Sequence, residues 1–360
     1  MQKNNPVPDD SALHVMDGIA SSHDGLASTP RKRFVKKERH IAIDELTEKI
    51  RGRSRLHLAK GITLLESTTL SDKEAGQKLL LNLLPDTGNS IRVGITGVPG
   101  AGKSTFIEEF GLMLCEAGHK VAVLAIDPSS SLTGGSILGD KTRMEELARH
   151  PNAFIRPSPT AGTLGGVHKK SRETMLLCEA AGYDVILIET VGVGQSETVV
   201  RGMVDFFMLL VLTGAGDELQ GMKKGIMELA DGIVVHKADG DNLRLAKKTV
   251  REYRQLLHFL QPASPGWTTT SQPVSSLAKT GLDDVWKTVL TFKEAMEGSG
   301  HWEGRRQSQT KDWFRSMIND RLIDTFFAEP GKKEEVRKLE NELLTGHITV
   351  TGAVDLLFKE

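Results

Sequence analysis

A glycine-rich segment carries the most specific chemical signal in the sequence. Its residues are Gly97, Val98, Pro99, Gly100, Ala101, Gly102, Lys103 and Ser104, with Thr105 following. They match G-x-x-x-x-G-K-[ST] between an apolar run and a helical run, which is the context that a phosphate-binding loop requires. Backbone N–H groups of such a loop and the N-terminus of the next helix bind phosphate oxygens. We therefore expect Lys103 to contact the β- and γ-phosphates of a nucleotide and the Ser104 hydroxyl to ligate Mg²⁺.

A carboxylate ends a second apolar run, Val185–Glu189. At the end of a strand beside the phosphate loop, Glu189 could hold a metal-bound water, and the N–H of Gly192 could approach the γ-phosphate. Gln195 could position the attacking water, or it could be a structural residue of a segment that senses the γ-phosphate. Lys103, Glu189 and Gln195 are therefore the candidate catalytic residues.

Two further acids lie on the expected phosphate side of the molecule. Asp127 ends the run Val121–Asp127, at the carboxyl edge of the sheet where doubly wound folds bind ligands. Asp140 precedes the helical run Lys141–Arg149, where it would serve equally well as the helix N-cap. The candidate Mg²⁺ ligands are therefore Ser104, Asp127, Asp140 and Glu189.

A third motif points to the nucleotide base. The tetrapeptide at His236, Lys237, Ala238 and Asp239 resembles the guanine signature N-K-x-D, with His in place of Asn. The Asp239 carboxylate would accept hydrogen bonds from N1–H and the amino group of guanine, and adenine lacks both donors. The stem of Lys237 would lie over the base. Asn normally ties the base to the phosphate loop, and a neutral imidazole could donate one such bond but not the full set of the amide.

A short serine-containing segment follows further along the chain. Proteins with the N-K-x-D signature place a backbone contact to guanine O6 at the position occupied here by Ser275, Ser276 and Leu277. The expected guanine-nucleotide site therefore draws on the phosphate loop, on Gly192 and on these two base-side segments.

The elements that must position these residues are short β-rich runs that alternate with helical stretches. The expected strands are Ile91–Thr96, Val121–Asp127, Ala153–Arg156, Val185–Glu189, Phe206–Thr213 and Ile233–His236. Strands that are apolar on both faces indicate an α/β fold, a doubly wound and mostly parallel sheet covered by helices. Helical spacing at both ends predicts helical extensions, with tail stretches at Trp313–Phe327, Glu334–Leu344 and Val350–Leu357. We expect a disordered basic lead-in at 1–40, a helical extension at 41–88, a P-loop GTPase domain at 89–298 and a helical arm at 299–360.

Composition excludes several other classes. The 360 residues include 46 Lys and Arg against 47 Asp and Glu, which disfavours a generally cationic nucleic-acid binder. Cys115 and Cys178 are too few for a disulfide framework or a four-thiolate zinc site. The longest apolar run, around Phe206–Leu212, is far shorter than the ~20 residues that cross a bilayer, and no signal peptide opens the chain. We therefore expect a soluble, cytoplasmic protein with neither a nucleic acid nor a membrane as its partner.

Taken in order, the motifs resemble those of the MeaB/ArgK-type G proteins, the SIMIBI-class P-loop GTPases associated with methylmalonyl-CoA mutase. The similar segments are GVPGAGKST from Gly97, DPSSSLTGGSILGDKTRM from Asp127, RPSPTAGTLGGV from Arg156, ETVGVGQSE from Glu189, TGAGDELQGMKKGI from Thr213 and KADGDN from Lys237. The resemblance implies a GTP-hydrolysing chaperone of an adenosylcobalamin-dependent acyl-CoA mutase. It would gate cofactor loading and protect or reactivate the mutase, and the adenosylcobalamin would belong to that partner.

The resemblance also implies roles that spacing does not show. Asp127, Asp140 and Glu189 correspond to Mg²⁺ positions of the family. Within a third switch at Gly214–Lys224, the polar members are Asp217, Gln220 and Lys223. The C-terminal helices correspond to a homodimerisation arm.

Two other classes share the phosphate loop. A nickel- or zinc-inserting metallochaperone GTPase usually carries a His tract or a Cys cluster, and this chain has two well separated cysteines and scattered histidines. A small-molecule P-loop kinase would transfer the phosphoryl group to an acceptor other than water and would need no guanine motif. The metallochaperone is the alternative to the mutase chaperone.

Overall fold

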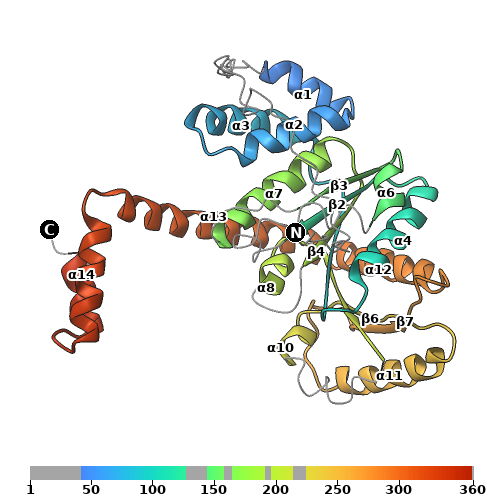
Figure 1. Cartoon of the computed structure of the whole chain (residues 1–360). Coiled ribbons are helices and arrows are strands. Elements are labelled where there is room, and N and C mark those ends of the chain that lie inside the picture. Colours follow the sequence, from blue (N-terminus) through green and yellow to red (C-terminus); the bar gives the residue numbers. More distant parts are fainter. Residues whose placement is uncertain (1–41, 127–143, 158–163, 191–195, 214–223, 359–360) are drawn as a thin grey trace, which may run out of the picture. The chain divides into compact units, whose positions relative to one another are not determined.

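The protein is built around a single parallel sheet. The computed structural model describes residues 42–126, 144–157, 164–190, 196–213 and 224–358. The strands are β1 (Ile91–Gly97), β2 (Val121–Ile126), β3 (Ala153–Arg156), β4 (Val185–Thr190), β5 (Phe206–Val211), β6 (Gly232–Val235) and β7 (Thr270–Pro273). These seven strands pair in the order β3-β2-β4-β1-β5-β6-β7 (Figure 1). The order places β1, which leads into the phosphate loop, between β4 and β5, and it confirms the predicted doubly wound α/β fold.

The sequence does not predict β7. Its residues, Thr-Ser-Gln-Pro, are polar and end in proline, so they lack the apolar run that marks the other strands. β7 lies at the edge of the sheet beside β6, where a proline is tolerated because one side of the strand needs no ladder partner. The strand is thus defined by pairing with its neighbour.

Helices surround the sheet and extend the chain at both ends. They are α1 (Ile43–Arg51), α2 (Arg55–Glu66), α3 (Leu70–Leu83), the 3₁₀ turn η1 (Leu84–Asp86), α4 (Lys103–Glu116), α6 (Glu145–Arg149), α7 (Leu164–Ala180), α8 (Ser196–Arg201), α10 (Lys224–Met227), α11 (Asn242–Leu257), α12 (Leu282–Gly298), α13 (His301–Ala328), α14 (Lys332–Leu344) and α15 (Val350–Leu357). None of these described helices is both long enough and apolar enough to cross a membrane.

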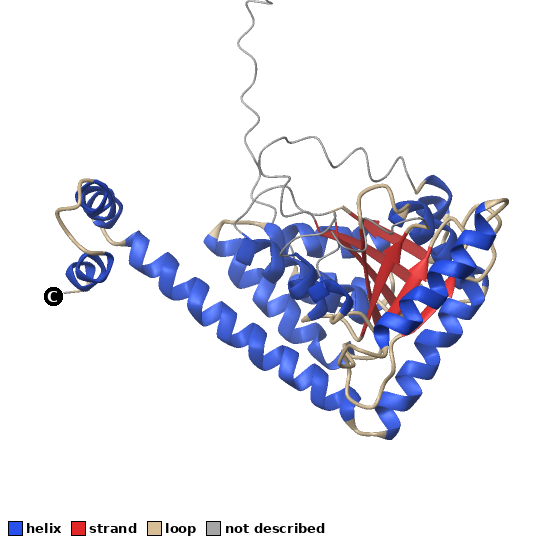
Figure 2. Ribbon diagram, turned by 90° about the horizontal axis from the view of Figure 1, so that it is seen from below, coloured by secondary structure: helices blue, strands red, loops and turns tan. Residues whose placement is uncertain are grey.

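Alternate residues of the central strands face two separate apolar clusters. Val185 and Leu187 of β4 belong to the cluster that includes α4 and α12, whereas Ile186 and Ile188 belong to the cluster that includes α1, α2, α7 and α8. Helices accordingly lie on both sides of the sheet (Figure 2). A strand buried on both faces must be apolar throughout, which is why these strands read as continuous hydrophobic runs.

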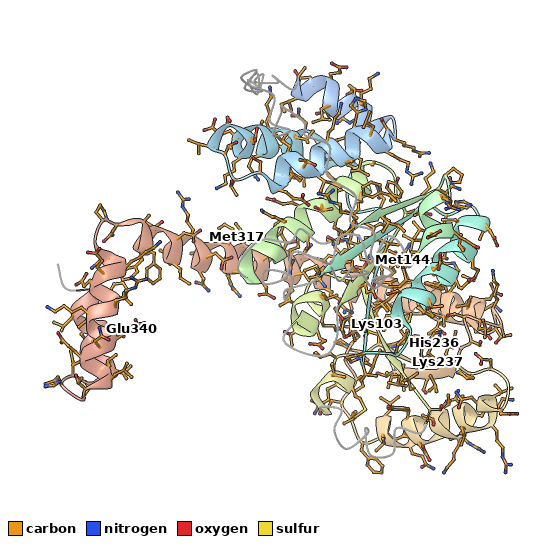
Figure 3. All side chains as sticks on the ribbon, in the orientation of Figure 1. Lys103, Met144, His236, Lys237, Met317 and Glu340 are labelled. Carbon is orange, nitrogen blue, oxygen red and sulfur yellow. The ribbon has the colours of Figure 1, made fainter. Side chains whose placement is uncertain are left out.

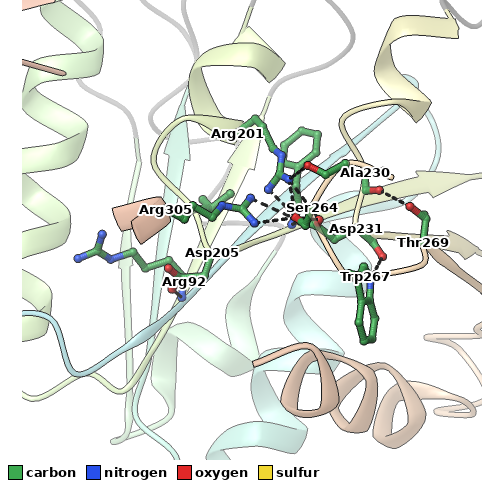
Figure 4. A network of polar contacts seen from close by, with 12 residues as sticks. Arg92, Arg201, Asp205, Ala230, Asp231, Ser264, Trp267, Thr269 and Arg305 are labelled. Atoms are coloured by element: carbon green, nitrogen blue, oxygen red, sulfur yellow. Dashed lines mark hydrogen bonds and ion pairs between the residues drawn. The ribbon is translucent and has the colours of Figure 1, made fainter. Parts of the chain in front are cut away.

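A charged network lies at the amino-terminal ends of β5 and β6, which is the sheet edge opposite the phosphate loop. Asp231, fully buried just before β6, accepts hydrogen bonds from Arg201 of α8 at 2.9 Å and from Ser264 at 2.6 Å. A nitrogen of Arg305, near the start of α13, lies 3.6 Å from the same carboxylate (Figure 4). One buried carboxylate thereby joins α8 to the base of the C-terminal arm.

Helix α13 begins earlier than the sequence predicts, at His301 and not near Trp313. The additional turns are attached by polar contacts: Arg306 donates to both oxygens of Asp205 at 2.8 and 2.7 Å, and Gln309 donates to the carbonyl of Val204 at 2.8 Å. Because these turns carry no apolar stripe, hydrophobic periodicity could not reveal them.

Glu179, in the last turn of α7, ties that helix to β1. Its side chain is 1% exposed and accepts hydrogen bonds from Arg92 at 2.8 and 3.0 Å, from Ser90 at 2.5 Å and from the Gly88 N–H at 2.9 Å. Burial by itself raises the pKa of Glu179, but the Arg92 guanidinium and the other donors outweigh it and hold the pKa below the usual carboxyl range.

We expect Glu179→Gln to lower the free energy of unfolding at pH 7 by about 3 kcal/mol, because it leaves the Arg92 guanidinium without a charged partner. A depressed folded-state pKa stabilises the fold above the unfolded pKa, and this contribution is lost as pH falls through the folded-state pKa. Urea titrations at pH 7 and in acid should therefore show the two proteins converging at low pH. Glu48→Gln, at an exposed pair with Arg51, should change stability by at most ~1 kcal/mol. Equal losses from both substitutions would contradict this role of Glu179.

Candidate functional site

Two glycines allow the loop between β1 and α4 to pass close to its neighbours. A Cβ on Gly97 would lie 2.4 Å from the carbonyl oxygen of Leu210 on β5. Gly102 has a φ of 85°, and a Cβ there would lie 2.8 Å from Nδ1 of His236. Any larger residue at either position would displace backbone or a buried ring. The motif therefore needs glycine at these two positions, because Leu210 of β5 packs against Gly97 and His236 packs against Gly102.

The Lys103 side chain lies within this loop. It is 8% exposed, and its ammonium donates hydrogen bonds to the carbonyls of Gly97 at 2.8 Å and Val98 at 3.4 Å. Burial lowers the pKa of Lys103, while the carboxylates of Glu189 and Glu197 act in the opposite direction. The ammonium is thus held at the loop by acceptors that the oxygens of a phosphate can replace.

The hydroxyl and carboxylate predicted to hold Mg²⁺ lie next to each other. Ser104 in the first turn of α4 donates a hydrogen bond of 3.1 Å to Glu189 near the end of β4, and the Glu189 side chain is largely buried. Glu189 is in register with Ile95 of β1, so strand pairing places it beside the loop. Two hard oxygen ligands at this separation fit part of a magnesium shell, which nucleotide phosphates and water would complete.

His236, which is labelled in Figure 3, connects the phosphate loop to the segment 275–277. Its Nδ1 lies 2.7 Å from the carbonyl oxygen of Ala101, and its Nε2 lies 2.7 Å from the hydroxyl of Ser276. A carbonyl only accepts, so Nδ1 carries the proton and donates to Ala101. Burial lowers the pKa of His236, which favours the neutral ring. The imidazole therefore takes over the tie to the phosphate loop that an Asn makes in the usual signature.

The remaining base-side residues also come together. Ser275 donates a hydrogen bond of 2.5 Å to the Asp239 carboxylate and accepts one from the N–H of Ala278 at 3.0 Å. Ser275 and Ser276 are buried, whereas the Leu277 side chain is 86% exposed. The structure thereby brings two predicted segments of the base site into direct contact.

Sequence reasoning assigned no role to Asn242, at the start of α11. Its side chain donates to the carbonyl of Lys237 at 2.6 Å and accepts from the Thr213 hydroxyl at 2.6 Å. Lys237 has a φ of 57°, a left-handed conformation that is uncommon outside glycine, and the Asn242 contact helps to hold it there. The sequence feature that could have indicated this role is that Asn242, a polar residue, begins a helix directly after KADGD.

Glu197 on α8 was expected only as part of the segment that senses the γ-phosphate, with no contact of its own predicted. Its side chain is 1% exposed, and its charge acts on the pKa of Lys103. Its place in the segment ETVGVGQSE was the sequence feature that could have indicated this role.

Seven of the site residues predicted from the sequence lie outside the described residues: Asp127, Asp140, Gly192, Gln195, Asp217, Gln220 and Lys223.

Known proteins are similar to this chain over most of its length. A putative GTPase of Caulobacter vibrioides is 52% identical over 317 residues, which span 88% of this chain and 97% of that protein. A Mus musculus protein named methylmalonic aciduria type A homolog, mitochondrial, is 45% identical and aligns over 88% of this chain and 79% of its own length. The crystal structure of a LAO/AO transport system kinase has a TM-score of 0.72 at 38% identity and covers 88% of this chain and 96% of that one.

A family model matches the chain over residues 58–331. This range contains the phosphate loop, the base-side segments and every strand of the sheet. The model describes methylmalonyl-CoA mutase-associated GTPases of the MeaB type. With identities of 45–52% to relatives over most of the chain, this match shows that the chain is a GTPase belonging to the MeaB family.

Proposed function

We propose that this GTPase binds GTP at the carboxyl edge of β1 and acts as a chaperone of an adenosylcobalamin-dependent acyl-CoA mutase. The proposal that the protein binds GTP rests on His236, whose ring forms hydrogen bonds to both the phosphate loop and the 275–277 segment. Lys103 lies in the phosphate loop, and the Asp239 carboxylate accepts a hydrogen bond from Ser275 of the 275–277 segment. Such a junction fits a ligand with a purine base and phosphates.

In the proposed mechanism, water attacks the γ-phosphorus in line, and the bond from that phosphorus to the β–γ bridging oxygen breaks, which yields GDP and phosphate. Lys103 and the backbone N–H groups of the loop stabilise negative charge on the transferring oxygens. Gln195 positions the attacking water. Ser104, Asp127, Asp140 and Glu189 would hold Mg²⁺, which supplies positive charge to the phosphates.

The partner assignment rests on the family. Its description names an association with methylmalonyl-CoA mutase, and the mouse relative is named for methylmalonic aciduria. Asp217, Gln220 and Lys223 would relay the nucleotide state to the mutase. In this proposal the adenosylcobalamin stays with the mutase, and the protein works in the cytoplasm.

We divide the chain into the four regions 1–40, 41–88, 89–298 and 299–360. The last region, the C-terminal arm, is proposed to form a homodimer. Helix α13 exposes a series of large apolar side chains from its midpoint to its end. They are Phe314, Ile318, Leu322, Ile323 and Phe327. Large apolar side chains gathered on an exposed helix are typical of a surface that a partner covers.

GTP turnover measured with candidate clients tests the proposal. Purified protein is mixed in turn with methylmalonyl-, isobutyryl- and 2-hydroxyisobutyryl-CoA mutase, and phosphate release is followed. The client should accelerate turnover by at least about tenfold, because a partner completes the charge stabilisation at the γ-phosphate. Lys103→Ala with the same mutase is the matched control and should show no acceleration. Acceleration by none of the mutases would contradict the chaperone role and leave the GTPase activity standing.

A further inference from the structure

Both ring nitrogens of His236 are already used inside the protein. An imidazole has one in-plane hydrogen-bonding site on each nitrogen. Nδ1–H donates to the Ala101 carbonyl at 2.7 Å, and Nε2, which has no proton in this tautomer, accepts from the Ser276 hydroxyl at 2.7 Å. No hydrogen-bonding site of the ring remains for a ligand.

The surroundings of the ring hold it in this orientation. His236 is 3% exposed, and the ring of Phe106 meets it edge-on with the centroids 5.9 Å apart. On another side, the absence of a Cβ at Gly102 leaves room for the ring and for little else. Turning either nitrogen toward a ligand would break a buried hydrogen bond and displace packed neighbours.

Along the edge of guanine from the amino group to O6, each polar group would have a partner in the proposed site. Asp239 would accept from N1–H and from the amino group, and the backbone of Ser275–Leu277 would donate to O6. The next acceptor along the same edge is N7. An Asn at position 236 has two amide N–H groups, so one can reach the phosphate loop while the other reaches the base. The imidazole has only one N–H, and Ala101 takes it.

We infer that this chain binds the guanine base without a hydrogen bond from residue 236 to N7, so that replacing N7 by C–H leaves the affinity of a guanine nucleotide unchanged. The inference rests on the proposed binding of GTP. Selection against adenine then depends on Asp239 and the O6 contact alone, because adenine also carries N7. His236 serves as a positioning residue that aligns the two loops.

Affinities for GTP and 7-deaza-GTP, in which a C–H replaces N7, test the inference on the full-length protein. Calorimetry should give dissociation constants for the two nucleotides within about twofold of each other. His236→Asn should bind GTP about three- to tenfold more tightly than 7-deaza-GTP, which is the value of one added hydrogen bond. His301→Asn, at an exposed site on α13, is the matched control and should keep the wild-type ratio.

A wild-type preference for GTP over 7-deaza-GTP of more than about twofold would overturn the inference. So would a folded His236→Asn protein that keeps the wild-type ratio. The wild-type measurement decides the matter alone if the variant fails to fold. Failure of the proposed function would look different, because GTP would then bind no better than ATP, whatever the result with 7-deaza-GTP.

Discussion

Replacement of Lys103 by alanine is expected to abolish tight GTP binding and to lower GTP turnover on the order of 10²–10³-fold. Lys103 is 8% exposed, and its ammonium already lies at the loop, on the carbonyls of Gly97 and Val98. Its charge is therefore preorganised for the β- and γ-phosphates, and alanine leaves these oxygens without their strongest hydrogen-bond donor in the loop.

Calorimetry with GTP and a phosphate-release assay measure the two effects of this substitution. Lys287→Ala is the matched control, because Lys287 is exposed and pairs only with Asp284 among the described ion pairs, so it should leave both quantities unchanged. Nanomolar or micromolar GTP affinity that survives Lys103→Ala would contradict the assignment of the phosphate loop.

Asp239→Asn is expected to weaken GTP binding on the order of 10²-fold and to create a site that prefers xanthosine triphosphate. The carboxylate can accept from both N1–H and the amino group of guanine. A carboxamide would turn its NH₂ group toward the amino group of guanine, placing two donors together, whereas xanthine presents a carbonyl oxygen at that position. The Ser275 hydroxyl, which donates to the carboxylate at 2.5 Å, can still donate to the amide oxygen.

Competition between the two triphosphates for each protein measures this exchange of specificity. Asp283→Asn, on the exposed first turn of α12, changes the same functional group away from the site and should keep the wild-type preference. Retention of the wild-type order, GTP above xanthosine triphosphate, in Asp239→Asn would show that another residue recognises the Watson–Crick edge of guanine.

The sequence by itself determined the fold class and the phosphate loop. Residues such as Val185–Ile188 are apolar on both faces of a strand, and this local pattern is sufficient to predict a buried parallel sheet. Gly97 ends β1 and Lys103 begins α4, so the geometry of the phosphate loop depends mainly on residues that are neighbours in the chain. The ends of most predicted strands agree with the structure within two residues for the same reason.

Only the tertiary structure decided how the base side is assembled. The ring of His236 contacts residues 135 and 40 positions away in the sequence, and no local pattern shows that both its nitrogens are taken. Asn242, β7 and the first turns of α13 gain their roles in the same way, through pairing, hydrogen bonds and ion pairs with distant segments. Hydrophobic periodicity reports which face of an element is buried, whereas the partner of a polar side chain depends on which distant atoms the fold brings within hydrogen-bond distance.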